Sequence, residues 1–329
     1  MIINMTAPAK QLMTEQGGTM VPAVAKNKTW FTTTMPSDPD WLAIAYGGGR
    51  FVAVAFNSDI GAYSEDGVNW IQMSMPCVSR WSCITYGDGK FVALTIGTGV
   101  AAYSENGVNW TQTTITRTGN WTGVAYGNGR FVAVEKLRGY AAYSLDGTSW
   151  TQTSMPQISA WTSVAYGNGV FVSVAYFSDT AAVTKDGITW ETVQLPPGPA
   201  WQTVCFANGL FLAVTYTGGT AAYSTDGINW TKVTLPNGLW YALAGGGGRF
   251  VVASEEDGRA ILSEDAIHWM QFQMPAIGQW DSIAYGQGKF AAIRHKSAIA
   301  ASLFDQVHQG DTLYVDPSVK SIAGWSRNA

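Results

Sequence analysis

The chain has 329 residues, of which 47% are hydrophobic and 13% are charged, where an average domain carries roughly 25% charged residues. This composition indicates a globular chain with a buried core and excludes intrinsic disorder. Because 19 basic residues stand against 23 acidic ones, the net charge of −4 gives no overall positive field for holding nucleic acid, which we exclude as a partner.

Residues 1–29 precede the patterned part of the chain. They lack a continuous apolar stretch ending in small residues, and no later segment offers about 20 consecutive apolar residues. The sequence therefore predicts no signal peptide, no membrane insertion and assembly in a reducing cytoplasm. Cys77, Cys83 and Cys205 are too few for a disulfide framework in a chain of this length and are interpreted as free thiols.

From residue 30 onward one unit recurs about every 40 residues. The first residue of each unit is a tryptophan, at Trp41, Trp81, Trp121, Trp161, Trp201, Trp240 and Trp280. A second series follows 29 positions later, at Trp70, Trp110, Trp150, Trp190, Trp230 and Trp269. Each unit reads as four short strands joined by Gly-rich and Asp-Gly turns, and a 40-residue period of four strands is typical of β-propellers.

The two ends of the repeat array complement each other. The seventh unit has Gln309 where its second tryptophan should stand, while the segment Trp30–Pro36 near the N-terminus matches Trp70–Pro76. The sequence thus predicts an all-β, seven-bladed β-propeller with four antiparallel strands per blade, in which Trp30–Pro36 completes the last blade and closes the ring. The predicted domains are an N-terminal extension (1–29), the propeller (30–309) and a C-terminal tail (310–329).

An Asp or Asn recurs in the turn between the third and fourth strands of each unit. In such turns the side chain accepts hydrogen bonds from nearby N–H groups, and the following Gly takes the left-handed conformation. We interpret these positions as structural turn residues. They are Asp66, Asn106, Asp146, Asp186, Asp226, Asp265 and Asp305.

These turns resemble the Asp-box (BNR-like) repeats of sialidase-like propellers and, more closely, the Y-S-x-D-G-x-x-W arrays of bacterial and bacteriophage proteins. The resemblance covers residues 30–305 and implies the fold more strongly than a function. Sialidases need a cluster of arginines with a tyrosine and acidic partners. This chain departs from that pattern, because Arg50, Arg130 and Arg249 all occupy the same hairpin position before the second strand.

The chain carries few signs of catalysis. Glycosidases need two carboxylates across the scissile bond, and Asp281 is the only acidic residue in the predicted inner strands. The three histidines, His268, His295 and His308, stand at unlike positions, and no nucleophile elbow or zinc motif is present. The sequence therefore predicts no enzyme, no metal site and no cofactor.

The loops on one face of the predicted ring vary freely between repeats. They are the loops between second and third strands and the connections between repeats, and variable loops on a rigid scaffold favour a binding surface. Basic and aromatic residues gather there and suggest acidic polysaccharide as a ligand. The candidate ligand-binding residues are Arg80, Arg117, Lys136, Arg138, Tyr140, Arg294, His295 and Lys296.

The leading hypothesis is a non-enzymatic binding or structural propeller of a bacteriophage particle. It would serve as a tail-fibre or receptor-binding component that contacts host surface polysaccharide or another virion protein. Residues 1–29 and 310–329 would attach it to other tail proteins. The alternatives are a stand-alone, lectin-like carbohydrate-binding propeller and, disfavoured, a sialidase-like glycoside hydrolase.

Overall fold

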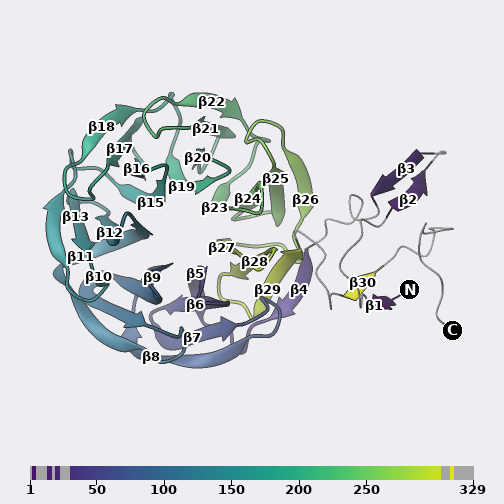
Figure 1. Ribbon diagram of the computed structural model, residues 1–329, viewed down its shortest axis with the longest axis horizontal. Coiled ribbons are helices and arrows are strands. Elements are labelled where there is room, and N and C mark those ends of the chain that lie inside the picture. Colours follow the sequence, from purple (N-terminus) through teal and green to yellow (C-terminus); the bar gives the residue numbers. More distant parts are fainter. Residues whose placement is uncertain (1, 5–12, 17–18, 23–29, 305–311, 315–329) are drawn as a thin grey trace.

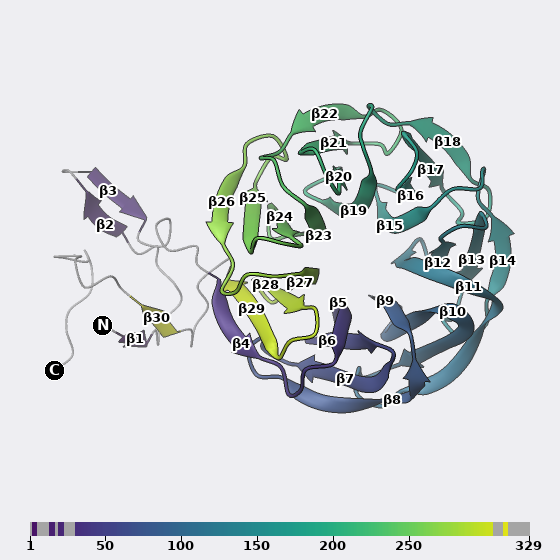
Figure 2. The same cartoon turned by 180° about the vertical axis from the view of Figure 1, so that it is seen from behind.

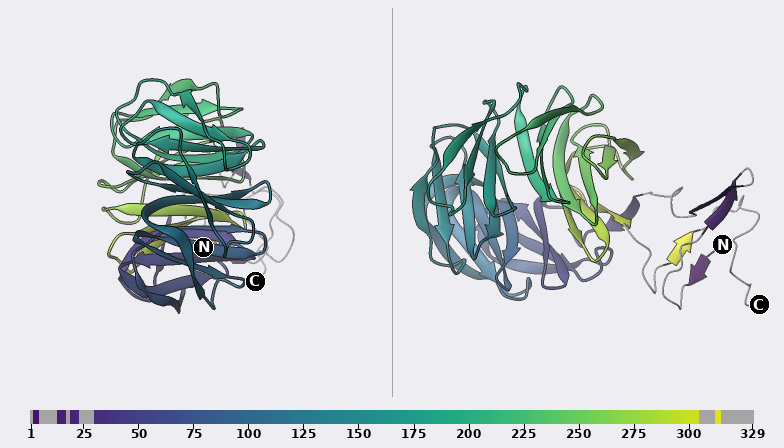
Figure 3. Two further views of the ribbon diagram at one scale, coloured as in Figure 1. Left: turned by 90° about the vertical axis from the view of Figure 1, so that its left-hand side faces the viewer. Right: turned by 45° about the horizontal axis from the view of Figure 1, so that its top comes forward.

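The computed structural model describes residues 2–4, 13–16, 19–22, 30–304 and 312–314. Residues 30–304 form a ring of antiparallel β-sheets placed radially around a central axis (Figure 1; seen from behind in Figure 2). In the side views the strands run between the two faces of the ring (Figure 3). The fold is an all-β propeller with four-stranded antiparallel blades.

The strands fall into four layers from the axis to the rim. The innermost strands are β5 (Asp40–Gly47), β9 (Trp81–Gly87), the second half of β11 (Thr111–Gly127), β15 (Trp161–Gly167), β19 (Trp201–Ala207), β23 (Trp240–Gly246) and β27 (Trp280–Gly286). The second strands are β6 (Arg50–Phe56), the first half of β10 (Lys90–Ser104), β12 (Arg130–Glu135), β16 (Val170–Ala175), β20 (Leu210–Thr215), β24 (Arg249–Ser254) and β28 (Lys289–Arg294).

The outer two layers have the same order around the ring. The third strands are β7 (Ser58–Ser64), the second half of β10, β13 (Tyr140–Ser144), β17 (Thr180–Thr184), β21 (Thr220–Ser224), β25 (Arg259–Ser263) and β29 (Ile299–Phe304). The outermost strands are β8 (Ile71–Ser79), the first half of β11, β14 (Thr151–Ser154), β18 (Glu191–Gln194), β22 (Thr231–Thr234), β26 (Met270–Gln273) and β4 (Phe31–Thr34).

The prediction of seven separate blades needs correction, because the ring contains six hydrogen-bonded sheets: five of four strands and one of six. The six-stranded sheet has the order β14-β13-β12-β11-β10-β9 and holds two sequence repeats. Its long strands β10 and β11 remain paired beyond the end of one repeat, with Ile96 opposite Asn120 and Thr98 opposite Gly119. Backbone pairing thus continues through the loop between the second and third strands and into the connection, so that β10 and β11 each run through two layers. In the first repeat Ser58 also pairs with Ser79, but the four strands there stay separate.

The last sheet joins strands from both ends of the ring. Its order is β27-β28-β29-β4, and β4 pairs antiparallel with β29 from Ile299 opposite Thr34 to Ser302 opposite Phe31. Trp30, just before β4, is 4% exposed and packs in the same core as Trp280. Residues at the start of the repeat array therefore supply the outermost strand of its last repeat.

Two short strand pairs lie outside the ring sequence. β1 (Ile2–Asn4) pairs with β30 (Thr312–Tyr314), and β2 (Met13–Gln16) pairs with β3 (Thr19–Pro22). The predicted attachment roles of 1–29 and 310–329 fall mostly outside the described residues. The predicted turn residue Asp305 also lies outside them.

The tryptophans that open the repeats are the largest buried side chains, and all seven are 0% exposed. In five repeats the indole N–H donates to the backbone carbonyl four residues earlier, as from Trp161 to Gln157 at 3.2 Å. Each of these rings therefore fills the core and also fixes the connection that leads into its repeat. Burial is common to all seven positions and accounts for the large apolar ring, and the hydrogen bond adds to it in these five repeats.

Neighbouring repeats also interlock at the far end of the inner strands. A Cβ added to Gly127 would lie 2.0 Å from Cγ of Tyr166 in the next repeat, so only glycine leaves room for the ring. The same pairing recurs at Gly47 and Tyr86, Gly87 and Tyr126, Gly167 and Phe206, Gly246 and Tyr285, and Gly286 and Tyr46. The last of these contacts joins the seventh repeat to the first.

Candidate functional site

The ring has two faces with different construction. One face, here called the box face, holds the turns between first and second strands and between third and fourth strands. The other, here called the variable face, holds the loops between second and third strands and the connections between repeats. Antiparallel pairing within every sheet places these two sets of loops at opposite ends of the strands.

The turns of the box face are built around the recurring Asp or Asn. Oδ1 of Asp66 accepts hydrogen bonds from the N–H groups of Val68 and Asn69, both at 2.8 Å, and from the Ser64 hydroxyl at 2.9 Å. Equivalent bonds surround Asn106, Asp146, Asp186, Asp226 and Asp265. In Asp226 the hydrogen bond from the Asn229 N–H holds the pKa of the carboxyl below its usual range.

Basic residues of the box face tie one repeat to the next. The Arg50 guanidinium donates to the Asn106 carbonyl at 2.7 Å and lies 5.4 Å from the centre of the Tyr63 ring. Lys90 and Arg130 make the matching bonds to the carbonyls of Asp146 and Asp186. These cations are used in contacts between repeats, so they do not form a sialidase-like arginine cluster.

The predicted ligand-binding residues divide into separate groups on the variable face. Arg117, Lys136, Arg138 and Tyr140 lie together on the third repeat and its entry, whereas Arg80 lies 6.0 Å from the Phe56 ring of the first repeat. Arg294, His295 and Lys296 belong to the seventh repeat. Among the described residues, no hydrogen bond or ion pair joins this last group to the others.

The group on the third repeat consists of basic side chains laid over aromatic rings. The Arg117 guanidinium is 5.0 Å from the centre of the Tyr140 ring, and the Lys136 ammonium is 6.0 Å from that of Tyr176. Arg138 donates to the Thr118 carbonyl at 2.9 Å, which places it beside the Arg117 loop. Arg117 and Arg138 are both exposed and can pair with an anion.

A second cluster, here called the acidic cluster, forms from Asp40, Glu255 and Asp281 where the inner strands reach the variable face. His295 Nδ1 lies 2.8 Å from Asp40 Oδ1 and 3.2 Å from Asp281 Oδ2, and so joins the last repeat to the first. Next to it, the Tyr216 hydroxyl donates to the Glu255 carboxylate. The rings of Tyr176, Tyr216 and Tyr241 follow one another at centroid distances of 6.2 and 6.4 Å.

Asp281 has the most perturbed carboxyl of the acidic cluster. Burial raises its pKa to about 8, the hydrogen bond from Gln279 opposes that rise, and the charges of Asp40 and Glu255 add to it. Burial together with Asp281 and Glu255 likewise raises the pKa of Tyr241 to about 12. At neutral pH Asp281 is therefore largely protonated and can donate a hydrogen bond.

We expect Asp281→Asn to stabilise the chain at alkaline pH. The raised folded-state pKa means that ionising Asp281 opposes folding, so its penalty grows above pH 4 and is complete above pH 8. Asparagine keeps an acceptor for Gln279 and carries no charge. One pKa unit corresponds to about 1.4 kcal/mol. In urea denaturation the free energy of unfolding of the variant should therefore exceed that of the original chain by about 1.4 kcal/mol or more at pH 9, and by little at pH 4. An equal gain at both pH values would contradict this account.

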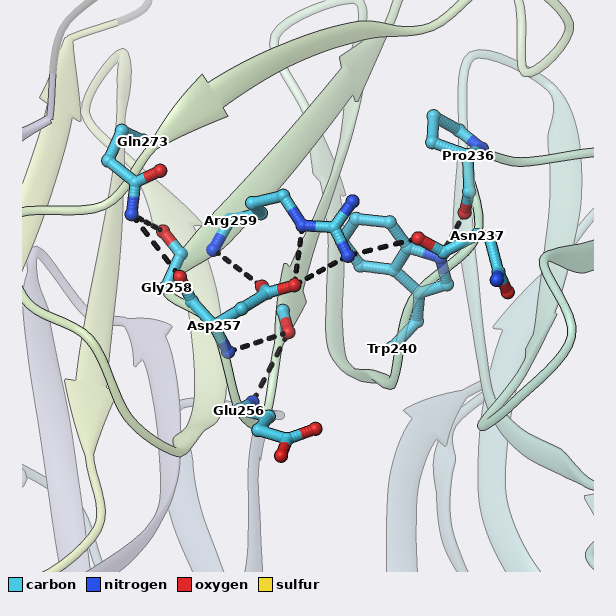
Figure 4. A network of polar contacts seen from close by, with 9 residues as sticks. Pro236, Asn237, Trp240, Glu256, Asp257, Gly258, Arg259 and Gln273 are labelled. Atoms are coloured by element: carbon cyan, nitrogen blue, oxygen red, sulfur yellow. Dashed lines mark hydrogen bonds and ion pairs between the residues drawn. The ribbon is translucent and has the colours of Figure 1, made fainter.

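The loop of the sixth repeat that contains Glu255, Glu256 and Asp257 is fixed by contacts of its own residues (Figure 4). The Arg259 guanidinium lies 2.5 Å from Asp257 Oδ2, donates to the Asn237 carbonyl at 3.0 Å and covers the Trp240 ring at 5.5 Å. The N–H groups of Glu256 and Asp257 both approach the Ser254 hydroxyl. The charge of Asp257 is thus neutralised within the loop, whereas Glu255 contacts Tyr216 and acts on Asp281.

The sequence did not indicate the acidic cluster, because Asp40 and Asp281 lie at the start of inner strands of the first and last repeats, and Glu255 lies in a loop of the sixth. Comparing the residue after the opening tryptophan between repeats could have pointed to the acidic cluster. The residue after the opening tryptophan is Ser82, Thr122 or Thr162 in three repeats, and its hydroxyl donates to the next Trp carbonyl. In the last three repeats that residue is Gln202, Tyr241 or Asp281, which breaks the pattern.

No metal site is apparent in the part of the chain that the structure describes, where no group of three His, Cys, Asp or Glu is arranged to hold an ion. Within the same residues no helix is long and apolar enough to cross a membrane.

A family model described as a DUF6242 beta propeller domain matches residues 158–279. No curated protein matches the sequence. Among solved structures, a virginiamycin B lyase from Staphylococcus aureus has a TM-score of 0.75 at 11% identity, covering 84% of this chain and 99% of that one. YCF48 bound to D1 peptide has a TM-score of 0.68 at 15% identity, covering 85% and 98%. YCF48 from Cyanidioschyzon merolae has a TM-score of 0.66 at 13% identity, covering 84% and 99%.

These similarities show that the chain contains a β-propeller, and at such low identity they show the fold alone. One of these neighbours is an enzyme by name and another is bound to a peptide, so the fold does not choose between catalysis and binding. The choice rests on the side chains of the variable face.

Proposed function

We propose that this chain is a non-enzymatic binding propeller of a bacteriophage particle, and that it engages its partner through the variable face. The observation that carries the proposal is the contrast between the faces. Box-face turns repeat the same hydrogen bonds around Asp66, Asp146 and Asp226, whereas the variable face changes its side chains from repeat to repeat. A rigid scaffold with one diversified face is how repeat proteins build binding surfaces.

Electron microscopy tests the placement on a particle. Immunogold labelling of particles purified from the strain that encodes the chain should mark a tail structure. An antibody against the box face should bind the intact particle more readily than one against the variable face if the partner is another virion protein. Label confined to the soluble fraction would remove the virion role.

A glycan array separates this proposal from the lectin-like alternative. The isolated chain should bind no glycan if its partner is a virion protein. Strong binding of acidic glycans by the isolated chain, lost on replacement of Arg117 and Arg138 by alanine, would favour a carbohydrate-binding propeller instead.

A glycoside hydrolase is the second candidate, and one observation favours it. Asp40, Glu255 and Asp281 lie near one another, with Asp281 largely protonated at neutral pH, and a glycosidase needs one protonated and one ionised carboxyl. Release of a chromophore from aryl glycosides, including an aryl sialoside, measures this activity. We expect none; release that disappears in Asp281→Asn would establish the enzyme.

We also propose that the ring acts as seven blades closed by β4, with two blades sharing the six-stranded sheet. Two features support this finer description: the pairing of β4 with β29, and the contact of Gly286 with Tyr46 between the last and first repeats. Closure would cover the outer edge of β29, give the last repeat four strands like the others, and hold the variable loops in fixed positions.

A further inference from the structure

Three large apolar side chains stand out of the variable face at the third and fourth repeats. Leu137 is 57% exposed, Ile158 78% and Phe177 80%. Hydrogen bonds between their loops hold them side by side. The Leu137 N–H donates to the Ser159 carbonyl at 3.3 Å, and the Gln157 amide donates to the hydroxyls of Thr180, at 2.6 Å, and Ser178, at 3.5 Å. The three residues therefore project from three loops that are bonded to one another, and they are here called the apolar patch.

The backbone at Leu137 is strained as well as exposed. Its φ of 100° lies in the region that residues with a Cβ avoid, and the equivalent residues of the first two repeats are Asn57 and Gly97, types that tolerate positive φ. Leucine at this position gains little burial, since more than half of it is exposed. The strained backbone therefore receives little stabilisation in return, as expected for a residue that contacts another molecule.

Positive charge borders the patch. Arg138 follows Leu137, Lys136 precedes it, and Arg117 lies beside Arg138 across the Thr118 carbonyl. The adjacent Glu135 does not offset them at the surface, because it is 0% exposed and accepts hydrogen bonds from the N–H groups of Asn120 and Arg138. Within the described residues none of the three cations forms an ion pair.

We propose that Leu137, Ile158 and Phe177, with Arg117, Lys136 and Arg138, form a docking surface for a segment of another protein that carries apolar side chains flanked by carboxylates. This inference rests on the proposed binding function and names its partner class. Apolar anchors surrounded by charge are the arrangement of protein interfaces, where a few exposed aromatic or aliphatic side chains enter the partner's pockets. A sugar ring can stack on Phe177, but a polysaccharide offers no apolar side chain to the aliphatic Leu137 and Ile158, so the patch favours a protein.

Selection from a library of short random peptides tests the docking surface through the chemistry of the peptides that it retains. Peptides displayed on yeast are sorted for binding to the full chain. We expect the enriched peptides to carry net negative charge and at least one large apolar residue. Their binding should weaken about tenfold or more in Phe177→Ser, and it should also weaken as salt rises, because the exposed cations are screened.

Matched variants show where the selected peptides bind. Arg117→Glu with Arg138→Glu should remove their binding, while Leu145→Ser and Lys185→Glu, on exposed box-face turns, should leave it unchanged. All four positions used in these variants are exposed, so folding should survive, and circular dichroism checks this.

The outcomes separate the two proposals. Enriched peptides that are neutral, basic or purely polar, or that still bind Phe177→Ser, overturn the docking surface. If those peptides lose binding when Glu255 or His295 is changed, variable-face binding stands but at another place. Loss of binding in Leu145→Ser would move the contact to the box face and overturn both proposals, and no enrichment over bait-free sorting would overturn the docking surface.

Discussion

Replacing Gly127 with alanine is expected to lower the free energy of unfolding by about 3 kcal/mol or more, although it adds a single methyl group. The added Cβ would lie 2.0 Å from Cγ of Tyr166 and 2.2 and 2.3 Å from its Cδ atoms, well inside van der Waals contact. Gly127 ends an inner strand, so its backbone cannot move away without disturbing the pairing of β11 with β12. Urea denaturation followed by tryptophan fluorescence measures the loss.

Gly129→Ala is the matched control for that variant. Gly129 lies in the following turn with a φ of 72°, and an added Cβ there would meet nothing within 4 Å. Alanine at this position should therefore cost only the strain of positive φ, about 1 kcal/mol. Equal losses in the two variants would show that backbone strain, and not contact with Tyr166, makes glycine necessary at residue 127.

One pair of neighbouring repeats carries both replacements together, at the glycine and at the aromatic ring that contacts it. Between the fifth and sixth repeats the glycine is replaced by Ala207, and the aromatic residue that should face it is replaced by Gly245, whose added Cβ would lie 2.5 Å from that of Ala207. Tyr166→Gly alone should cost about 3–5 kcal/mol through the lost ring. Combined with Gly127→Ala it should cost less than the sum of the two, with a coupling of about 1–3 kcal/mol. Strict additivity would contradict the proposed complementarity.

The fold could be predicted from the sequence because every repeat contains the same pattern of a buried Trp, a Gly turn and an Asp turn. The pairing of β4, from the start of the array, with β29 at its end could be predicted for the same reason, since Trp30–Pro36 has the pattern of an outermost strand. The merging of two repeats into one sheet was not, because it depends on backbone pairing of Ile96 and Thr98 through a loop that has no distinctive residues.

The variable face was only partly predictable. Arg117, Lys136, Arg138 and Tyr140 are close in sequence, so their grouping could be expected, whereas His295 meets Asp40 only after the first and last repeats come together. The exposed patch was missed because apolar loop residues such as Ile158 and Phe177 look ordinary in a sequence rich in them. Only their exposed surface distinguishes them from the core.

Removal of residues 1–36 is expected to abolish cooperative folding of the ring. The truncation deletes β4 with its pairing to β29, and it removes Trp30 and Met35, which are 4% and 2% exposed. Burying side chains of this size contributes about 2–5 kcal/mol each, so their joint loss approaches the whole stability of a typical domain, about 5–15 kcal/mol. It also uncovers the edge of β29, a template for aggregation. Size-exclusion chromatography and thermal unfolding measure both effects.

Two further chains distinguish closure of the ring from a general effect of shortening. Removal of residues 1–29 keeps Trp30 and β4 and should leave the unfolding transition nearly unchanged. A permuted chain that starts at residue 37 and carries residues 30–36 after residue 309 should recover a cooperative transition, because the strand needs only to reach β29 and not to precede it in sequence. If the chain lacking residues 1–36 unfolds at the temperature of the full chain, β4 does not close the ring. If the permuted chain stays unfolded, the order of the segments matters in a way that pairing with β29 does not explain.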